Sequence, residues 1–450
     1  AGAIASASSE LAPHISPPPG TVAIKIRDLA DCWVATLALQ ARGYRTVCVA
    51  SLDVLASLEV RGLLAIVVSA DEEGVAEANR LAPVYAMRKP VFDDAVAFDP
   101  PPLAEGVEAC GHILYTSGTT GKYKKVFLPA RTQRAAAQER CRLQGHNRDT
   151  RYNALSFGLW TSIGYKMAAS VWSIGGIVIL DQREGWPEHF VSSGLTRATI
   201  LPDQALQLSK YSRLTDIASN DDSRPTIAVA GGFLSAKLAE HLSQYFDLKN
   251  IYGCTEVNVG VLIQDVEAPL GVSWMTLQGT REVEIENDRH QVSAVNEEGR
   301  LRIKLTDLDA QGYLDEPELS SSAFNNGYFY PGDLAVRRND GKFRILGRAA
   351  DVVNLAGQKL AVAPIEANLQ TILQVDYVCL FAGVNAAGEP EAVIAMEAAE
   401  LPSKDRLDHV GQEFSQWGEV RFALLESFPR TQSGTSKIDR KRLRELIFAV

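Results

Sequence analysis

Residues 21 to 51 read TVAIKIRDLADCWVATLALQARGYRTVCVAS. A short apolar run is followed by a stretch with apolar residues at helical spacing, and then by a second apolar run. Gly43 stands where the helix would end, a position that glycine often occupies. The stretch therefore predicts a strand, a helix and a second strand.

The same alternation continues along the chain and predicts an α/β fold. Further strands are expected at residues 62–70, 112–115, 175–180, 198–202 and 226–232. Strands that alternate with helices form mainly parallel sheets, and ligands bind beyond the carboxyl ends of such strands. Ala230, Gly231 and Gly232 lie at one of these ends.

The later part of the chain has a different pattern. From about residue 271 the expected strands are short and polar-alternating, as in EVEIEN (282–287), HQVSAV (290–295) and RLRIKL (300–305). This pattern predicts a small antiparallel β subdomain over about 271–346. We expect a large core over 21–346 and a small α+β C-terminal domain over 347–450. Residues 1–20, rich in alanine, serine and proline, are expected to form a flexible segment.

Composition limits the range of partners. The chain has 450 residues, more than one compact core accommodates, and a net charge of −10, which argues against binding nucleic acid. Six cysteines are scattered without a C-x-x-C pair, as expected in a reducing compartment. No apolar run is long enough to span a bilayer, and the start lacks the basic residue of a signal peptide. We expect a cytoplasmic protein with no nucleic-acid or membrane partner.

Residues 115–125, YTSGTTGKYKK, have the chemistry of a phosphate-binding loop. Glycines let the backbone approach a bulky anion, and successive backbone N–H groups form an anion-binding concavity. The hydroxyl side chains add donors and the lysines add charge. The spacing matches neither the P-loop nor the dinucleotide-binding pattern, so the loop alone predicts phosphate binding without a particular chemistry.

Four more motifs follow in order: YGCTE (252–256), PGD (331–333), GRAADVVNLAGQKLAVAPIE (347–366) and PRTQSGTSKIDR (429–440). Together with the loop, they resemble the adenylate-forming (AMP-binding) superfamily. This superfamily includes acyl- and aryl-CoA synthetases, stand-alone adenylation domains and luciferases. The resemblance covers roughly residues 21 to 448.

The resemblance implies a role for each motif residue in binding ATP and Mg²⁺. Tyr252 would stack on adenine, Thr255 would reach the α-phosphate and Glu256 would bind Mg²⁺. Asp333 would accept hydrogen bonds from the ribose hydroxyls, with Arg348 assisting. The implied nucleotide site also contains Thr116, Ser117, Gly118, Thr119, Thr120, Gly121, Lys124, Ala230, Gly231, Gly232 and Gly253.

The implied reaction has two steps. A carboxylate attacks the α-phosphate of ATP with release of pyrophosphate, and a thiol of coenzyme A or of carrier-protein phosphopantetheine then takes the acyl group. Lys437 would be catalytic in the first step. A mobile C-terminal domain would turn about residues 347–351 and present Gly357 and Lys359 in the second.

The acyl pocket would contain Phe157, Trp160, Ser162 and Phe233. The segment 156–165 has no acidic side chain that could hold the ammonium of an amino acid, which favours an apolar acyl or aryl acid. Two other functions are weighed against this one. A non-catalytic nucleotide-binding relative stays open, and a dinucleotide-dependent oxidoreductase is opposed by the missing G-x-G-x-x-G.

The chain departs from the family pattern at several places. Tyr123 stands for a proline, whose loss would loosen the loop, and Lys125 stands for a glycine, where the added charge would compensate. Thr435 and Ser436 lengthen the loop before Lys437, and Ala350 stands at the hinge. The N-terminal part is shorter than is usual, which predicts a trimmed subdomain.

Overall fold

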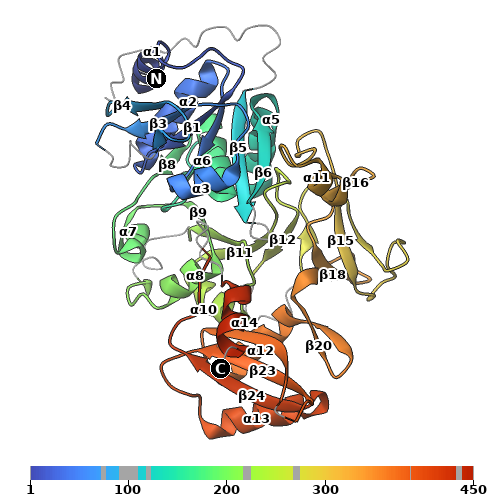
Figure 1. Ribbon diagram of the computed structural model, residues 1–450. Coiled ribbons are helices and arrows are strands. Elements are labelled where there is room, and N and C mark those ends of the chain that lie inside the picture. Colours follow the sequence, from blue (N-terminus) through green and yellow to red (C-terminus); the bar gives the residue numbers. More distant parts are fainter. Residues whose placement is uncertain are drawn as a thin grey trace.

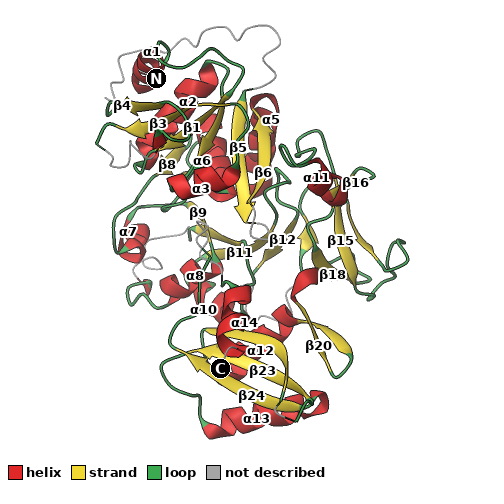
Figure 2. Cartoon of the chain, in the orientation of Figure 1, coloured by secondary structure: helices red, strands yellow, loops and turns green. Residues whose placement is uncertain are grey.

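The computed structural model describes residues 2–71, 78–90, 110–117, 123–215, 224–266, 274–385, 387–431 and 438–448. From the N-terminal end, Figure 1 shows two successive sheets, an antiparallel sheet beside the second, and the C-terminal region at the far end. Helices surround the first two sheets, whereas the third region consists mostly of strands (Figure 2). The predicted α/β class with an antiparallel region is confirmed.

The first sheet is parallel except at one edge, and its strand order is β4-β3-β1-β2-β5-β6. Its strands are β1 (Thr21–Lys25), β2 (Arg45–Cys48), β3 (Leu63–Ser69), β4 (Val84–Met87), β5 (Gly111–Ser117) and β6 (Tyr123–Pro129). Helix α2 (Leu29–Ala41) follows β1 and is capped by Asp28, while α3 (Leu52–Leu58) follows β2. The predicted strand, helix and strand are therefore present.

The second sheet has the order β13-β12-β11-β10-β9-β7-β8. Its strands are β7 (Arg151–Asn153), β8 (Ile177–Ile179), β9 (Arg197–Ile200), β10 (Thr226–Ala230), β11 (Asp247–Tyr252), β12 (Leu262–Asp265) and β13 (Thr276–Leu277). The accompanying helices are α5 (Ala130–Gln144), α6 (Ser162–Ser173), α7 (Trp186–Ser192), α8 (Pro202–Ser209) and α10 (Ala236–Leu242). Strands β7 to β11 are parallel, and β12 and β13 continue the sheet antiparallel.

The third sheet is antiparallel throughout. It contains β14 (Val283–Glu286), β15 (Gly299–Lys304), β16 (Phe324–Asn325), β17 (Tyr328–Phe329), β18 (Asp333–Arg337) and β19 (Phe343–Arg348), with helix α11 (Pro317–Ala323) before β16. The strand predicted at 290–295 was wrong. The chain turns at Asn287–His290, and this stretch pairs only at one isolated bridge. Val292 and Val295 stay exposed, with no strand among the described residues to cover them.

The C-terminal region forms its own hydrophobic clusters. It contains the hairpin β20 (Val352–Leu355) and β21 (Gln358–Ala361), the strands β22 (Tyr377–Val384), β23 (Pro390–Glu397) and β24 (Glu419–Leu425), and the helices α12 (Val362–Leu373), α13 (Lys404–Phe414) and α14 (Arg440–Phe448). By contrast, one cluster extends from the first sheet to the third. The two regions are therefore packed around different cores.

The N-terminal segment differs from the expectation of a flexible stretch. It forms helix α1 (Gly2–Leu11), whose Ala3, Ala7 and Leu11 are buried in the main hydrophobic cluster. These side chains recur at helical spacing and pack on α2, which the alanine-rich composition concealed. Among the described residues, no helix has the length and hydropathy needed to cross a membrane.

Candidate active site

Parallel pairing of β10 with β11 brings two predicted motifs together. Ala230 at the end of β10 is in register with Ile251, so the AGG turn and the YGCTE motif leave the sheet side by side. Gly231 has φ of +84°, which favours glycine, and a Cβ there would lie 3.1 Å from the Leu201 side chain. Both motifs thus emerge at the carboxyl edge, where ligands bind in parallel sheets.

Tyr252, Asp333 and Arg348 form one hydrogen-bonded group. The Tyr252 hydroxyl donates to Oδ2 of Asp333 at 2.5 Å, and Arg348 Nε lies 3.2 Å from Oδ1. Asp333 and Arg348 face each other because β18 and β19 pair in that register. Burial and the facing carboxylate raise the pKa of Tyr252 well above its usual value, so it remains a neutral donor. The group links the second sheet to the third.

A second tyrosine holds the other predicted carboxylate. Glu256 is buried, and its Oε1 accepts a hydrogen bond of 2.7 Å from the Tyr313 hydroxyl. Lys124 Nζ lies 5.0 Å from the centre of the Tyr313 ring, and Lys124 pairs with Thr116 across β5 and β6. The strands that flank the phosphate loop therefore reach Glu256 through Tyr313. Sequence reasoning missed Tyr313, because an aromatic residue between strands carries no local signal of this contact.

Lys125 does not supply charge to the phosphate loop as expected. Its buried ammonium donates to the carbonyls of Leu58 and Glu59 at 2.8 and 3.1 Å, and lies 3.5 Å from Asp315. Leu58 is the last residue of α3, where a positive charge is favourable. Lys125 is thus a helix-capping residue, because alternation along β6 points it away from the side of Lys124.

Tyr123 takes part in packing where a proline was expected. It begins β6, and its ring meets that of Tyr115 edge to face at 5.3 Å between centres. Gly118, Thr119, Thr120 and Gly121 lie outside the described residues, and only the backbone of Ser117 is described. The predicted loosening of the loop therefore stays a prediction.

The four predicted pocket residues do not share one hydrophobic cluster. Phe157 is buried in the cluster of the second sheet, and Trp160 packs against the main cluster. Ser162 is the first residue of α6, whose N-cap is Thr161, and Phe233 is exposed beyond the AGG turn. Their common role as a pocket stays a prediction.

His112 holds the loop that carries Phe157 and Trp160. Its Nε2 donates to the Leu159 carbonyl at 2.8 Å, and its Nδ1 lies 2.9 Å from Thr46 Oγ1. The ring stacks on Tyr165 with 4.0 Å between centres. Burial lowers the pKa of His112 to about 4, so the imidazole stays neutral. The residue is therefore structural.

The predicted thiolation residues lie in the C-terminal region. Ala356 and Gly357 form the turn between β20 and β21, and both have positive φ, as a tight hairpin turn requires. Lys359 is exposed on β21. Lys437, with Thr435 and Ser436, lies outside the described residues. This region contacts the core through an ion pair between Lys210 Nζ and Asp376 Oδ2 at 2.6 Å. The Tyr377 hydroxyl also donates a hydrogen bond to Asp203 Oδ1 at 3.1 Å.

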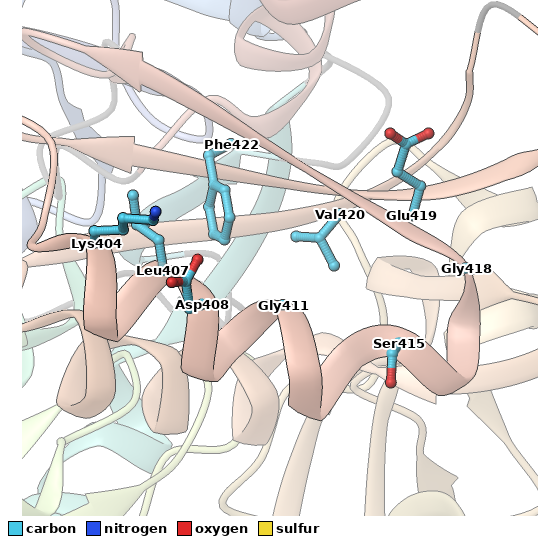
Figure 3. Close-up of a pocket in the computed structure, with 9 residues that line it drawn as sticks. All are labelled: Lys404, Leu407, Asp408, Gly411, Ser415, Gly418, Glu419, Val420 and Phe422. Carbon is cyan, nitrogen blue, oxygen red and sulfur yellow. The ribbon is translucent and has the colours of Figure 1, made fainter.

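A separate hollow of about 530 Å³ lies between α13 and β24 (Figure 3). Val420 and Phe422 point from the strand toward the helix, where Gly411 leaves open space. All of its lining residues belong to the C-terminal region. It is therefore distinct from the group around Asp333 and Glu256.

Comparisons with known proteins indicate the family and the fold of the chain. The model of a family described as AMP-binding enzyme matches residues 29–314. Bacitracin synthase 3 of Bacillus licheniformis is 27% identical over 370 residues, 76% of this chain but 6% of that synthase. The chain thus spans only a small part of that relative's length.

Solved structures share the fold over nearly the whole chain. O-succinylbenzoate coenzyme A synthetase from Bacillus subtilis, in complex with ATP and magnesium ion, has a TM-score of 0.81 at 21% identity, with 98% of this chain and 93% of that chain covered. ATP-bound MatB from Rhodopseudomonas palustris has a TM-score of 0.82 at 18% identity, with 99% and 92% covered. Because the family model covers more than half of the sequence, the chain belongs to the family of AMP-binding enzymes.

Proposed function

We propose that the protein activates a carboxylic acid with ATP and then transfers the acyl group to a thiol. In the first step a carboxylate oxygen attacks the α-phosphorus, the bond to the bridging oxygen breaks, and pyrophosphate leaves. The thiol then attacks the acyl carbonyl, and AMP leaves. The observation that carries this proposal is the convergence of Glu256, Asp333 and the strands of the phosphate loop at the end of β11.

The Asp333 group suits the nucleoside end of ATP. A carboxylate is an acceptor with two oxygens, so it can receive both ribose hydroxyls. Arg348 orients the carboxylate through the 3.2 Å contact. Tyr252 presents a ring beside it on which adenine can stack, while its hydroxyl stays on Asp333. Gly253 and the AGG turn leave room for the base.

The Glu256 group suits the phosphate end. Mg²⁺ takes carboxylate and phosphate oxygens and usually keeps several waters, so a single protein carboxylate fits it. Among the described residues no cluster of three or more metal-binding side chains occurs, in keeping with a cation held mainly by phosphates. When bound, Mg²⁺ would neutralise phosphate charge. Thr255, Lys124, Thr116 and the loop 117–121 would orient the departing pyrophosphate.

The C-terminal region would complete the site. We assign to Lys437 the role of bridging the substrate carboxylate and the α-phosphate, where a preorganised charge favours the transition state. The domain 347–450 would turn about residues 347–351 for thiol transfer. Gly347 has φ of +118° and Ala349–Asp351 form a short 3-10 turn, which suits a hinge between β19 and β20.

The substrate class follows from the pocket segment. Residues 156–165 offer no carboxylate for a substrate ammonium, which favours an apolar acyl or aryl acid. The acceptor would be coenzyme A or the phosphopantetheine arm of a carrier protein. Likeness to a coenzyme A synthetase supports the former, and likeness to a peptide-antibiotic synthase supports the latter.

ATP–pyrophosphate exchange tests the proposal. With Mg²⁺ and a panel of fatty, aryl and amino acids, we expect exchange with at least one apolar or aryl acid. If ATP binds but no acid supports exchange, the protein is instead a non-catalytic nucleotide-binding relative. The same panel identifies the substrate.

A further inference from the structure

The loop that carries Glu256 is held in place by hydrogen bonds to its backbone carbonyls. All four carbonyls from Thr255 to Asn258 accept a hydrogen bond from described residues. The donors are Lys166 Nζ to Thr255 O (2.8 Å), Ala310 N to Glu256 O (3.0 Å), Lys166 Nζ to Val257 O (3.4 Å) and Arg140 Nη1 to Asn258 O (2.7 Å). Such complete pairing leaves the loop few ways to relax.

Lys166 contacts the loop on both sides of Glu256. It lies on α6 and is buried, with 4% of its surface exposed. Its ammonium donates to the carbonyls of Thr255 and Val257, so one side chain spans the residue that carries the carboxylate. No other described side chain donates to both carbonyls.

The arrangement is costly for the fold. Arg140 is also buried, at 3% exposed, and within the described part of the chain neither cation lies within 4 Å of a carboxylate. Burying a charge without an opposite charge destabilises a protein. Burial and the nearby Arg140 charge lower the pKa of Lys166 to about 7. An apolar side chain at this position would avoid that cost but would leave the carbonyls of Thr255 and Val257 without this donor, so the lysine serves to hold the loop.

We propose that Lys166, supported by Arg140, is a positioning residue for acid activation. It fixes the backbone on both sides of Glu256 and so keeps the carboxylate aimed at the metal–nucleotide complex. The inference rests on the proposed function of Glu256. It adds a residue that makes no contact with the expected ATP and acts only through the loop.

Magnesium-dependent ATP binding gives the first test. In calorimetry, Mg²⁺ should tighten ATP binding to the wild type. In Lys166→Met the factor by which Mg²⁺ tightens ATP binding should be smaller by on the order of tenfold or more, as expected when charged hydrogen bonds are removed. In the exchange assay the KM for ATP should rise while the KM for the acid stays unchanged. Met167→Ala is the matched control, because Met167 lies on the same helix and packs in a cluster with Tyr152 and Val171. The cavity it opens should lower stability without changing the magnesium effect or the KM for ATP.

Cysteine labelling gives a test that does not require activity. Cys254 precedes the loop and is partly exposed, whereas the other five cysteines are buried. Lys166→Met should accelerate maleimide labelling of Cys254 severalfold, and adding Cys254→Ser should abolish the extra labelling. Met167→Ala should not accelerate it.

The outcomes separate the two proposals. If Lys166→Met matches the wild type in its magnesium response and in Cys254 labelling, the positioning role is wrong and the proposed function stands. If the wild type does not bind ATP, the proposed function is wrong, and the labelling rate still shows whether Lys166 holds the loop. Should Lys166→Met not fold, Arg140→Met removes the loop's donor to Asn258 O, together with the Arg140 hydrogen bond to Ser170 Oγ. It should give a smaller change in the same direction, and no change would contradict the proposal.

Discussion

The core and the C-terminal region are held together by different kinds of contact. Within the core, one hydrophobic cluster joins the first and third sheets, and the Glu256 loop has all four carbonyls paired. Between the core and the region that begins at β20, the described side-chain contacts include Lys210–Asp376 and Tyr377–Asp203. Lys210–Asp376 joins two exposed side chains, and such a pair contributes little to stability. We therefore expect the site in the core to stay rigid while the C-terminal region moves as a unit.

The largest expected effect concerns the moving region. Lys437→Ala should lower pyrophosphate exchange by on the order of 10²-fold or more, because a preorganised charge is removed. The same variant, given synthetic acyl-adenylate, should still transfer the acyl group to a thiol. Separate assays of the two half-reactions check this.

Lys441 provides the matched control for that variant. It lies on α14, four residues after Lys437. Exchange that survives in Lys437→Ala but is lost in Lys441→Ala would show that the insertion of Thr435 and Ser436 moved the role. Equal loss of both half-reactions would argue against a region that alternates.

The next largest effect concerns Asp333 in the core. Asp333→Ala should weaken ATP binding by at least about tenfold, since the loss of even one charge-assisted hydrogen bond costs about 1.5–3 kcal/mol. Calorimetry measures it. Asp340→Ala, which removes an exposed carboxylate near β18 that is paired with Arg338, serves as control. Equal affinities in the two variants would remove Asp333 from the site.

The sequence predicted the motifs of the site in the core better than the residues that hold those motifs in place. Strand alternation correctly predicted the AGG turn at a carboxyl end of the sheet, whereas the strand that brings YGCTE beside it was not predicted. Tyr313 and Lys166 were missed because their contacts depend on tertiary packing of distant segments. Lys166 did leave one signal, since it stands in SIGYKMAASVWS, a helix that is apolar on most sides and therefore buried. Alanine-rich α1 likewise gave no amphipathic pattern clear enough to read.

Acidification should weaken the core. The folded state keeps His112 and His146 neutral until their lowered pKa of about 4, whereas the unfolded chain protonates near 6.5. The unfolded state therefore binds more protons between these values, and stability falls as pH falls from 6.5 to 4. For His112 the loss is on the order of 3 kcal/mol.

Urea unfolding across this pH range measures the effect. His112→Gln should flatten the dependence of unfolding free energy on pH, while His290→Gln should not, because His290 is exposed. If the unfolding free energy of His112→Gln depends on pH as steeply as that of the wild type, the folded state does not keep the His112 imidazole neutral.

The smallest effect concerns the contacts between the two regions. Lys210→Ala combined with Tyr377→Phe should weaken docking by about 1 kcal/mol or less. Limited proteolysis near residues 349–351 should become up to a few times faster. Lys249→Ala, which removes an exposed pair inside the core, should not change that rate. Equal cleavage of the two variants would mean that other contacts hold the C-terminal region.

Oxygen-isotope transfer tests acyl-adenylate formation most directly. The acid that supports exchange is supplied with ¹⁸O in its carboxylate, together with ATP, Mg²⁺ and the thiol, and AMP is analysed by mass spectrometry. The proposed attack on the α-phosphorus predicts one ¹⁸O atom in AMP and none in pyrophosphate. Label in inorganic phosphate, or unlabelled AMP formed during thioester synthesis, would contradict the account.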